Sequence, residues 1–248
     1  MSLLIFTVAS GEYLEYADIF QYCVNQSYPE YSIKVLKNYS DTVKFMSPCM
    51  RYLIEPEEYL NKYDYYYITD IDMMILAEDK SIVDFHTEEM RQTGLSYSNT
   101  IRNKEALGSE RMTGLHFCTP QWYKTTHTER EKYKDFIIRG EYGHGKYDDE
   151  TMLKKITMGS GLDLPPRYGL IRRHHGIHIG TIRDFYKKKY TTIKNQLTYR
   201  VALKQCIKWQ DVYQSGGNKI ISKIKNKKIR EEFSILDKYT MGRIKCSI

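Results

Sequence analysis

The pattern of apolar and polar positions predicts alternating strands and helices from the start of the chain. Residues 3–9 are almost continuously apolar, which is typical of a strand buried on both faces. Apolar residues then recur at three- and four-residue spacings from Leu14 to Val24, as on one face of a helix. A second strand is expected at residues 31–36. This strand-helix-strand order predicts a parallel sheet.

Later segments continue the alternation. Further strands are expected at 65–69, 73–76, 94–97 and 115–118, and helices at 51–60 (regular from Pro56), 120–138 and 149–156. Residues 159–180 are rich in Gly and Pro, which predicts a loop. Beyond Asp184 the pattern is basic and helical, with an interruption at 215–217. We therefore expect an α/β fold: a mixed, mostly parallel sheet flanked by helices over residues 1–186, and a basic helical extension over 187–248.

Composition is that of a soluble globular protein. The chain has 248 residues, 41% of them hydrophobic, and no apolar run approaches the ~18 residues of a membrane span. The apolar opening segment lacks a basic n-region and is expected to be the first strand rather than a signal peptide. The five cysteines are scattered and never form a C-x-x-C pair, which argues against a disulfide framework or a zinc knuckle. A cytoplasmic location is expected.

Charge is unevenly distributed along the chain. Residues 187–248 hold 16 Lys and Arg against 4 Asp and Glu, a net +12, which leaves −5 for residues 1–186 out of the total of +7. Segments 187–190 and 220–229 mix basic and apolar residues, as a helix lying on a membrane surface does. The basic extension is expected to contact an anionic surface (membrane, nucleic acid or polyanionic glycan), peripheral membrane contact included; a solvated face is the alternative.

The most informative local feature is the triplet Asp70-Ile71-Asp72, directly after the strand expected at 65–69. In extended backbone both carboxylates would point the same way, because side chains alternate along a strand. Two hard oxygen ligands suit Mg²⁺ or Mn²⁺ together with a substrate phosphate. An acidic turn without a ligand is the alternative.

The order of motifs over residues 1–186 resembles that of GT-A-type (Rossmann-like) glycosyltransferases, most of all the family-eight retaining enzymes that use nucleotide-sugar donors. Residues 5–13 resemble the strand and turn that hold base and ribose, which implies donor contacts at Thr7, Ala9 and Tyr13. Residues 47–54 look like the segment with a donor-binding arginine, here Arg51, for which a structural role is the alternative. Asp70 and Asp72 match the metal-binding Asp-x-Asp, and the resemblance implies that Asp70 also contacts the donor.

Later motifs keep the same order. Residues 112–117 resemble the strand beside the donor sugar, with Gly114 as its small residue, and 164–168 resemble a Leu-Pro loop. The family then ends on His-x-x-Gly-x-x-Lys-Pro-Trp. Here His178-Ile-Gly180-Thr-Ile-Arg183 is closest, one residue shorter, with Arg for Lys and without Pro-Trp. The resemblance implies His178 as the third metal ligand, with His175 as the rival, and donor contacts at Gly180 and Arg183.

The catalytic candidates are Asp149 and Glu150. Residues 149–153 resemble an Asp-Gln-Asp-aliphatic-Leu motif, but this chain has a carboxylate, Glu150, in place of the neutral amide. Glu150 could be a nucleophile in a retaining reaction or a general base in an inverting one. Asp149 could take either role, Asp148 keeps the cluster ambiguous, and an acidic first turn of a helix is the bland alternative. Retention is slightly favoured.

The resemblance thus implies a metal-dependent, hexosyltransferase-type enzyme using Mn²⁺ or Mg²⁺. The donor would be a nucleotide-diphosphate sugar, with a UDP-sugar favoured, and the acceptor a hydroxyl of a glycan or lipid-linked molecule. A nucleic-acid-binding protein is the main alternative from another class, given the basic extension, although no nucleic-acid-binding motif is present. A metal-dependent nucleotidyltransferase is the second alternative, because it also needs paired carboxylates and a metal.

Overall fold

The computed structural model describes residues 1–37, 47–54, 60, 62–102, 110–142, 148–166, 175–183 and 202–245. The chain forms two compact units. Unit 1 consists of Met1–Gly11, Tyr31–Asp70 and Lys80–Arg173, and unit 2 of Glu12–Glu30, Ile71–Asp79 and His174–Ile248. The boundary expected between residues 186 and 187 lies within 184–201, outside the described residues, and remains a prediction.

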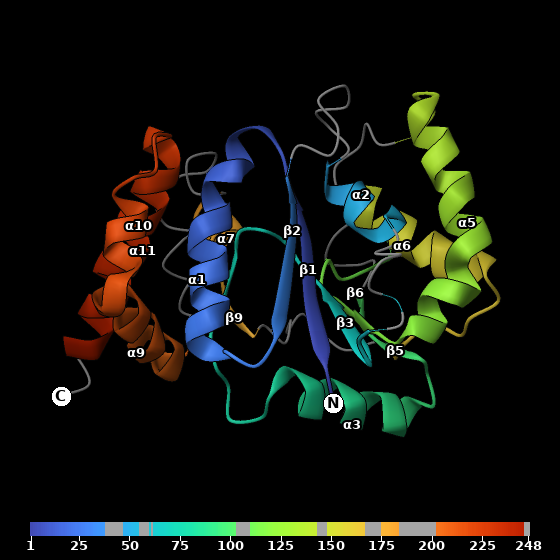
Figure 1. Ribbon diagram of the computed structural model, residues 1–248, viewed down its shortest axis with the longest axis horizontal. Coiled ribbons are helices and arrows are strands. Elements are labelled where there is room, and N and C mark those ends of the chain that lie inside the picture. The colour runs from blue at the N-terminus through green and yellow to red at the C-terminus, as the bar shows by residue number, and fades with distance from the viewer. Residues whose placement is uncertain are drawn as a thin grey trace. The chain divides into compact units, whose positions relative to one another are not determined.

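Unit 1 is built on a five-stranded mixed sheet (Figure 1). Its order is β2 (Ser32–Lys37), β1 (Leu3–Ala9), β3 (Tyr65–Ile68), β8 (His116–Cys118) and β5 (Tyr97–Ser98). β1 is parallel to β2 and β3, as the strand-helix-strand pattern predicts, whereas β8 runs antiparallel to β3 and β5. Every residue of β1 is buried, which confirms the interpretation of its continuous apolar run.

The core of unit 1 lies between one face of this sheet and three helices, α2 (Ser47–Leu53), α5 (Pro120–Ile138) and α6 (Asp148–Gly159). Leu4, Phe6 and Val8 of β1 alternate toward this cluster, where Trp122 is fully buried. α2 begins four residues before the expected helix because Ser47-Pro48 places proline in a first turn, where no N–H is needed. The expected start at Pro56 lies outside the described residues.

Two further features of unit 1 differ from expectation. The helix α3 (Ile82–Thr93) is not anticipated by the pattern, although the Ser81 hydroxyl caps it by accepting from the Asp84 N–H at 3.0 Å. The strand expected at 94–97 starts only at Tyr97, because Gly94 ends α3 in the left-handed conformation at φ +72°. β6 (Ile101–Arg102) and β7 (Arg111–Met112) form a separate antiparallel pair.

Unit 2 contains a short antiparallel ladder of β4 (Met73–Ile75) and β9 (Gly176–His178). β9 lies within the expected loop 159–180, which is therefore wrong over these residues. The close approach requires glycine: Gly176 has φ +140°, and a Cβ there would lie 1.9 Å from the Met74 carbonyl oxygen. α1 (Ala17–Ser27), preceded by the 3₁₀ turn η1 (Gly11–Tyr16), packs on β4, with Cys23 Sγ 3.8 Å from Met74 Sδ.

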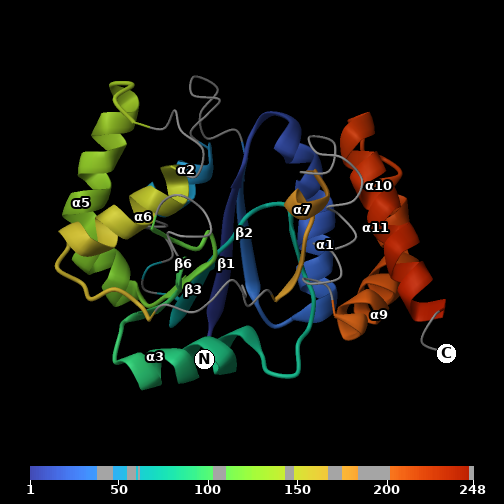
Figure 2. The ribbon, with the colours of Figure 1, turned by 180° about the vertical axis from the view of Figure 1, so that it is seen from behind.

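Among the described residues of unit 2, the short helix α7 (Gly180–Arg183) follows β9. Residues 203–221 and 227–245 are helical, as the basic pattern predicts: α9 (Leu203–Val212), the π turn η2 (Tyr213–Gly217), α10 (Asn218–Ile221) and α11 (Lys227–Lys245). α9 and α11 lie side by side (Figure 2). They pack together through stacked Trp209 and Phe233, whose ring centroids are 5.8 Å apart. The interruption expected at 215–217 is confirmed by Gly216, whose φ of +148° is not helical. No described helix has the length and apolar character needed to cross a membrane.

Candidate active site

Arg51 is the centre of a buried ionic network in unit 1. Its Nη1 donates to Asp70 Oδ1 at 2.5 Å and its Nη2 to Asp149 Oδ2 at 2.8 Å. α2 presents the arginine, Asp70 follows the end of β3, and Asp149 lies in the first turn of α6. Burial alone would lower the pKa of Arg51, but the two carboxylates hold it well above its usual value. Burial raises the pKa of Asp149, against the lowering effect of Arg51.

The peptide groups of Gly114 connect this network to a third carboxylate, that of Glu150. The Gly114 carbonyl accepts from the Tyr52 hydroxyl at 2.6 Å and from Arg51 Nη2 at 3.5 Å, while its N–H donates to Glu150 Oε1 at 3.1 Å. A Cβ at this position would lie 3.0 Å from Arg51 Nη2 and 3.2 Å from Asp70 Oδ2. A side chain larger than that of glycine would therefore crowd the ionic network, and Arg51 or Asp70 would have to shift by a few tenths of an ångström.

Glu150 is held by two arginines that the sequence did not single out. Arg111 Nε lies 2.5 Å from Glu150 Oε2, and Arg102 Nη2 lies 3.0 Å from Oε1. The two arginines are directly paired in the β6–β7 ladder, a relation that only the register of two short strands creates. Burial raises the pKa of Glu150 to about 7, even though both arginines lower it. Asp148 begins α6, but its side chain is outside the described part of the structure.

Asp72 and His178 come together in unit 2. His178 Nε2 lies 3.2 Å from Asp72 Oδ1, because the β4–β9 register places Met73 opposite His178 and the Ile179 N–H donates to the Asp72 carbonyl at 2.9 Å. The rival His175 is 4% exposed, and burial lowers its pKa to about 4. The geometry thus pairs the aspartate with His178.

Asp70, Asp72 and His178 form a group that can hold a metal ion. Asp70 precedes Asp72 by two residues, so chain connectivity holds their Cα atoms within about 7 Å. The expected extended backbone is wrong, because the chain turns at Ile71-Asp72. Adjacent ligand atoms around an octahedral ion with ~2.1 Å bonds are about 3 Å apart, which fits the Asp72–His178 contact. Two carboxylates and one imidazole suit Mn²⁺, and the carboxylates also suit Mg²⁺.

The remaining predicted donor contacts are distributed over both units. In unit 1, Thr7 is fully buried and its hydroxyl donates to the Thr69 carbonyl at 2.8 Å, so it fixes the backbone just before Asp70; Ala9 is also buried. In unit 2, the Tyr13 ring packs on the Tyr16 ring, with the two ring centroids 5.9 Å apart. Gly180 and Arg183 begin and end α7, and the Arg183 side chain lies outside the described residues.

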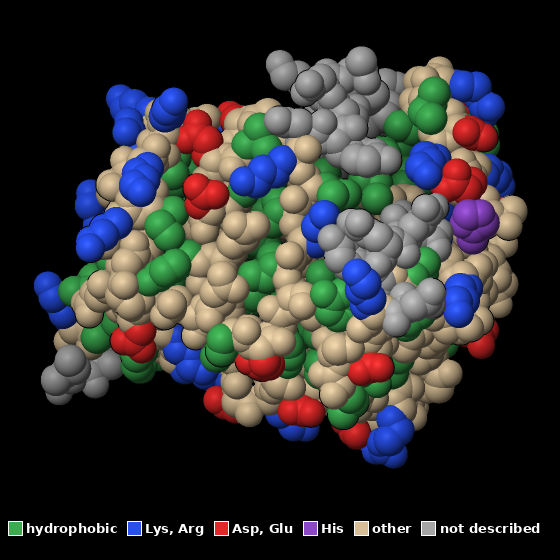
Figure 3. All heavy atoms as spheres, in the orientation of Figure 1, with side chains coloured by type: hydrophobic (Ala, Val, Ile, Leu, Met, Phe, Trp, Pro, Cys, Tyr) green, Lys and Arg blue, Asp and Glu red, His purple; other side chains and the backbone are tan. Residues whose placement is uncertain are grey.

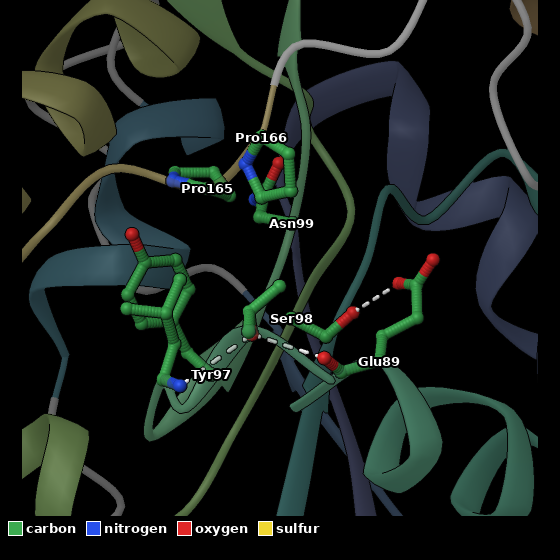
Figure 4. A pocket seen from close by; sticks show the side chains of 8 residues that line it. Glu89, Tyr97, Ser98, Asn99, Pro165 and Pro166 are labelled. Atoms are coloured by element: carbon green, nitrogen blue, oxygen red, sulfur yellow. Dashed lines mark hydrogen bonds between the residues drawn. The ribbon is translucent and has the colours of Figure 1, made fainter. Parts of the chain in front are cut away.

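A small cavity in unit 1 lies beside a second polar cluster (Figure 4). Its lining includes Glu89, Ser98 and Asn99, and the Ser98 hydroxyl donates to Glu89 Oε2 at 2.6 Å. His86 Nδ1 is 2.7 Å from the same hydroxyl. The cavity volume of about 10 Å³ matches about one water molecule. It is therefore too small for a sugar or a nucleotide.

The basic extension presents Lys and Arg side chains along α10 and α11 (Figure 3). Lys219 of α10 is exposed, as are Lys223 and Lys225 between α10 and α11. Three of the four apolar residues in the expected membrane-surface stretch 220–229 are instead buried within unit 2: Ile221 is 8%, Ile224 5% and Ile229 3% exposed, and Ile220 is half-buried. The other expected stretch, 187–190, lies outside the described residues. Insertion of this stretch into a membrane is therefore not supported.

No protein-family model matches the chain, and no curated protein matches it in sequence. Two solved glycosyltransferase structures are similar to it. One is a glycosyltransferase involved in the glycosylation of the major capsid of PBCV-1, with a TM-score of 0.47 and 11% identity, covering 67% of this chain and 82% of that one. The other is apo-form GlyE of Streptococcus pneumoniae TIGR4, with a TM-score of 0.45 and 13% identity, covering 82% of this chain and 52% of GlyE. Because both TM-scores lie below 0.5, the case for a function rests on the site residues.

Proposed function

We propose that the chain is a metal-dependent glycosyltransferase that moves a sugar from a nucleoside-diphosphate donor, with a UDP-sugar favoured, to a hydroxyl of a glycan or lipid-linked acceptor. The observation that carries this proposal is the ionic network of Arg51. One guanidinium binds Asp70, the first residue of the Asp-x-Asp triplet, and Asp149, a candidate for sugar contact. Arg51 and Asp149, which are 98 positions apart in sequence, are thereby in direct contact.

The metal group supports the diphosphate part of the proposal. An ion on Asp70, Asp72 and His178 would supply positive charge for the two phosphates and stabilise the departing nucleoside diphosphate. Asp72 is 4% exposed, and a buried carboxylate is costly unless a cation or hydrogen bonds compensate it. The His178 imidazole lies beside it in the position of a further ligand.

The protein residues provide positioning and electrostatics. Arg51 holds the Asp70 and Asp149 carboxylates in fixed orientations, which lowers the entropic cost of arranging them around a donor. The Asp149–Glu150 pair supplies the catalytic carboxylate, with retention favoured by the family resemblance and inversion as the alternative. The acceptor hydroxyl would then be activated or positioned beside this pair.

Calorimetry with UDP and GDP, each with and without Mn²⁺, tests the proposal. We expect Mn²⁺-dependent binding of one of the two diphosphates, and at least tenfold weaker binding in Asp72→Asn with the fold retained by circular dichroism. Asp211→Asn is the matched control, because Asp211 is exposed on α9 of the same unit. An Asp72→Asn variant that binds the nucleotide with unchanged metal dependence would refute the assignment. Tighter binding of nucleoside triphosphates than of nucleotide sugars would instead favour a nucleotidyltransferase.

A further inference from the structure

Asp149 and Glu150 are adjacent in sequence but differ in their surroundings. The Glu150 side chain is 5% exposed, against 17% for Asp149 and 21% for Asp70. Both Glu150 oxygens are engaged: Oε2 with Arg111, and Oε1 with Arg102 and with the Gly114 N–H. A carboxylate that must attack or deprotonate a substrate needs an oxygen directed at that substrate, and hydrogen bonds from cations reduce its nucleophilicity.

The contacts of Glu150 connect it, through Gly114, to Arg51. Its oxygen fixes the Gly114 N–H, and the carbonyl of the same residue accepts from Tyr52 and from Arg51 Nη2. The same Nη2 donates to Asp149 Oδ2, while Nη1 donates to Asp70. A continuous series of contacts therefore runs from Arg102 and Arg111 through Glu150 and Gly114 to Arg51.

We propose that Glu150 is a positioning residue, which fixes the Gly114 backbone and through it Arg51, and that Asp149 is the carboxylate presented to the donor. The second part rests on the proposed function. Arg102 and Arg111 balance the charge of Glu150, while Arg51 joins the two more exposed carboxylates. Loss of the Glu150 charge would leave the two arginines without their shared anion and release the Gly114 peptide.

UDP with Mn²⁺ distinguishes this role from direct catalysis, because UDP lacks the sugar that the reaction transfers. A residue that acts only at the anomeric carbon makes no contact with UDP, so its amide variant binds UDP like the wild type. A residue that positions Arg51 and Asp70 weakens UDP binding when it is changed. We expect Glu150→Gln to lower the affinity for Mn²⁺–UDP by about fivefold.

A double-mutant cycle tests whether the effect passes through Arg51. In an Arg51→Lys background, Glu150→Gln should cause less than about a twofold further loss, because the forked contact that it positions is already missing. Glu110→Gln is the matched control: Glu110 forms a 2.5 Å ion pair with Lys154 of α6 outside the network, and its change should leave UDP affinity unchanged. Should Glu150→Gln fail to fold, Arg102→Gln removes one ion pair to Glu150 and should give a smaller loss with the same dependence on Arg51.

The outcomes separate this inference from the proposed function. Wild-type UDP affinity in Glu150→Gln, or full additive losses in the double variant, would overturn the positioning role. Absence of metal-dependent UDP and GDP binding in the wild-type protein would overturn the proposed function. In that case the wild type, Glu150→Gln, Arg51→Lys and the double variant are compared by thermal unfolding. If the Tm loss of the double variant equals the sum of the two single losses, the positioning role is overturned. A loss in the double variant that is clearly smaller than this sum supports it.

Discussion

At the scale of single residues, the site is an arrangement of balanced buried charge. Three arginines and three carboxylates of unit 1 contact one another: Arg51, Arg102, Arg111, Asp70, Asp149 and Glu150. Removing one partner of a buried ion pair typically costs about 3–5 kcal/mol, because the other charge is left uncompensated. Such a network contributes little to the net stability of the folded state, but it holds each of its side chains in one orientation. That property suits a site that must hold several carboxylates ready for a ligand.

Gly114→Ala tests the space at the centre of this network. The added Cβ would lie 3.0 Å from Arg51 Nη2, so we expect a loss of about 1–3 kcal/mol in the free energy of unfolding and weaker Mn²⁺–UDP binding. Calorimetry and thermal unfolding measure the two effects. Gly242→Ala, where a Cβ meets nothing within 4 Å on α11, should instead stabilise by about 0.5–1 kcal/mol. Unchanged binding in Gly114→Ala would contradict the expected crowding.

The pH dependence of stability should carry a contribution from Glu150. Its ordinary pKa of 4.5 rises to about 7 in the folded chain because of burial, with Asp149 adding to the rise and Arg102 and Arg111 opposing it. Between these values the folded state binds more protons than the unfolded state, so this group's contribution to stability decreases as the pH rises from 4.5 to 7. Below pH 4.5 its contribution is complete.

Glu150→Gln has no ionisable group there and should lack this decrease. The measurement is the Tm of wild type minus the Tm of the variant at several pH values. This difference should fall between pH 4.5 and 7 and be flat outside that range. A difference that rises with pH would mean that the arginines outweigh burial.

At the scale of elements, the β4–β9 ladder brings His178 to Asp72, and the ladder depends on Gly176. An alanine there would place Cβ 1.9 Å from the Met74 carbonyl oxygen, at a φ of +140°. We expect Gly176→Ala to cost about 3 kcal/mol or more in unfolding free energy and to abolish Mn²⁺ binding. Gly94→Ala is the control for backbone strain alone: its φ is +72°, nothing lies within 4 Å, and it should cost about 1 kcal/mol with metal binding intact. Equal effects of both changes would exclude a special role for the ladder.

Periodicity predicts long elements better than short ones. The continuous apolar run of β1 and the helix Pro120–Ile138 agree with their sequence patterns, because burial over many residues dominates local preferences. β9 has three residues and exists through pairing with β4, a partner 100 residues away that no local pattern reveals. α3 is amphipathic and is also marked by a serine cap and a terminal glycine, so its sequence carries signals that the prediction does not use.

At the scale of the whole molecule, the candidate site depends on contacts between distant segments. The order of motifs predicts Arg51, Asp70 and Asp149 through a family resemblance, and their mutual contacts agree with a common site. Arg102 and Arg111 escape such reasoning, because an arginine in a two-residue strand carries no motif and its role follows from Glu150 alone. The role of Tyr52 also escapes sequence reasoning. Its position fits the apolar face of a helix, and only the structure shows that its hydroxyl donates to the Gly114 carbonyl.

Ligand binding should therefore appear in the unfolding of the full chain. A ligand present at about 100 times its Kd stabilises the folded state by about 3 kcal/mol, which for a chain of this size raises the Tm by about 5–10 °C. Mn²⁺ and UDP together should produce this rise, and each alone a much smaller one. The reason is that the ion would be coordinated both by Asp70, Asp72 and His178 and by the diphosphate of UDP. EDTA should reverse the shift, and Asp72→Asn should lack it while Asp211→Asn retains it. A shift of the same size with UDP alone would place the nucleotide away from Asp70, Asp72 and His178, and would separate the nucleotide site from the metal group.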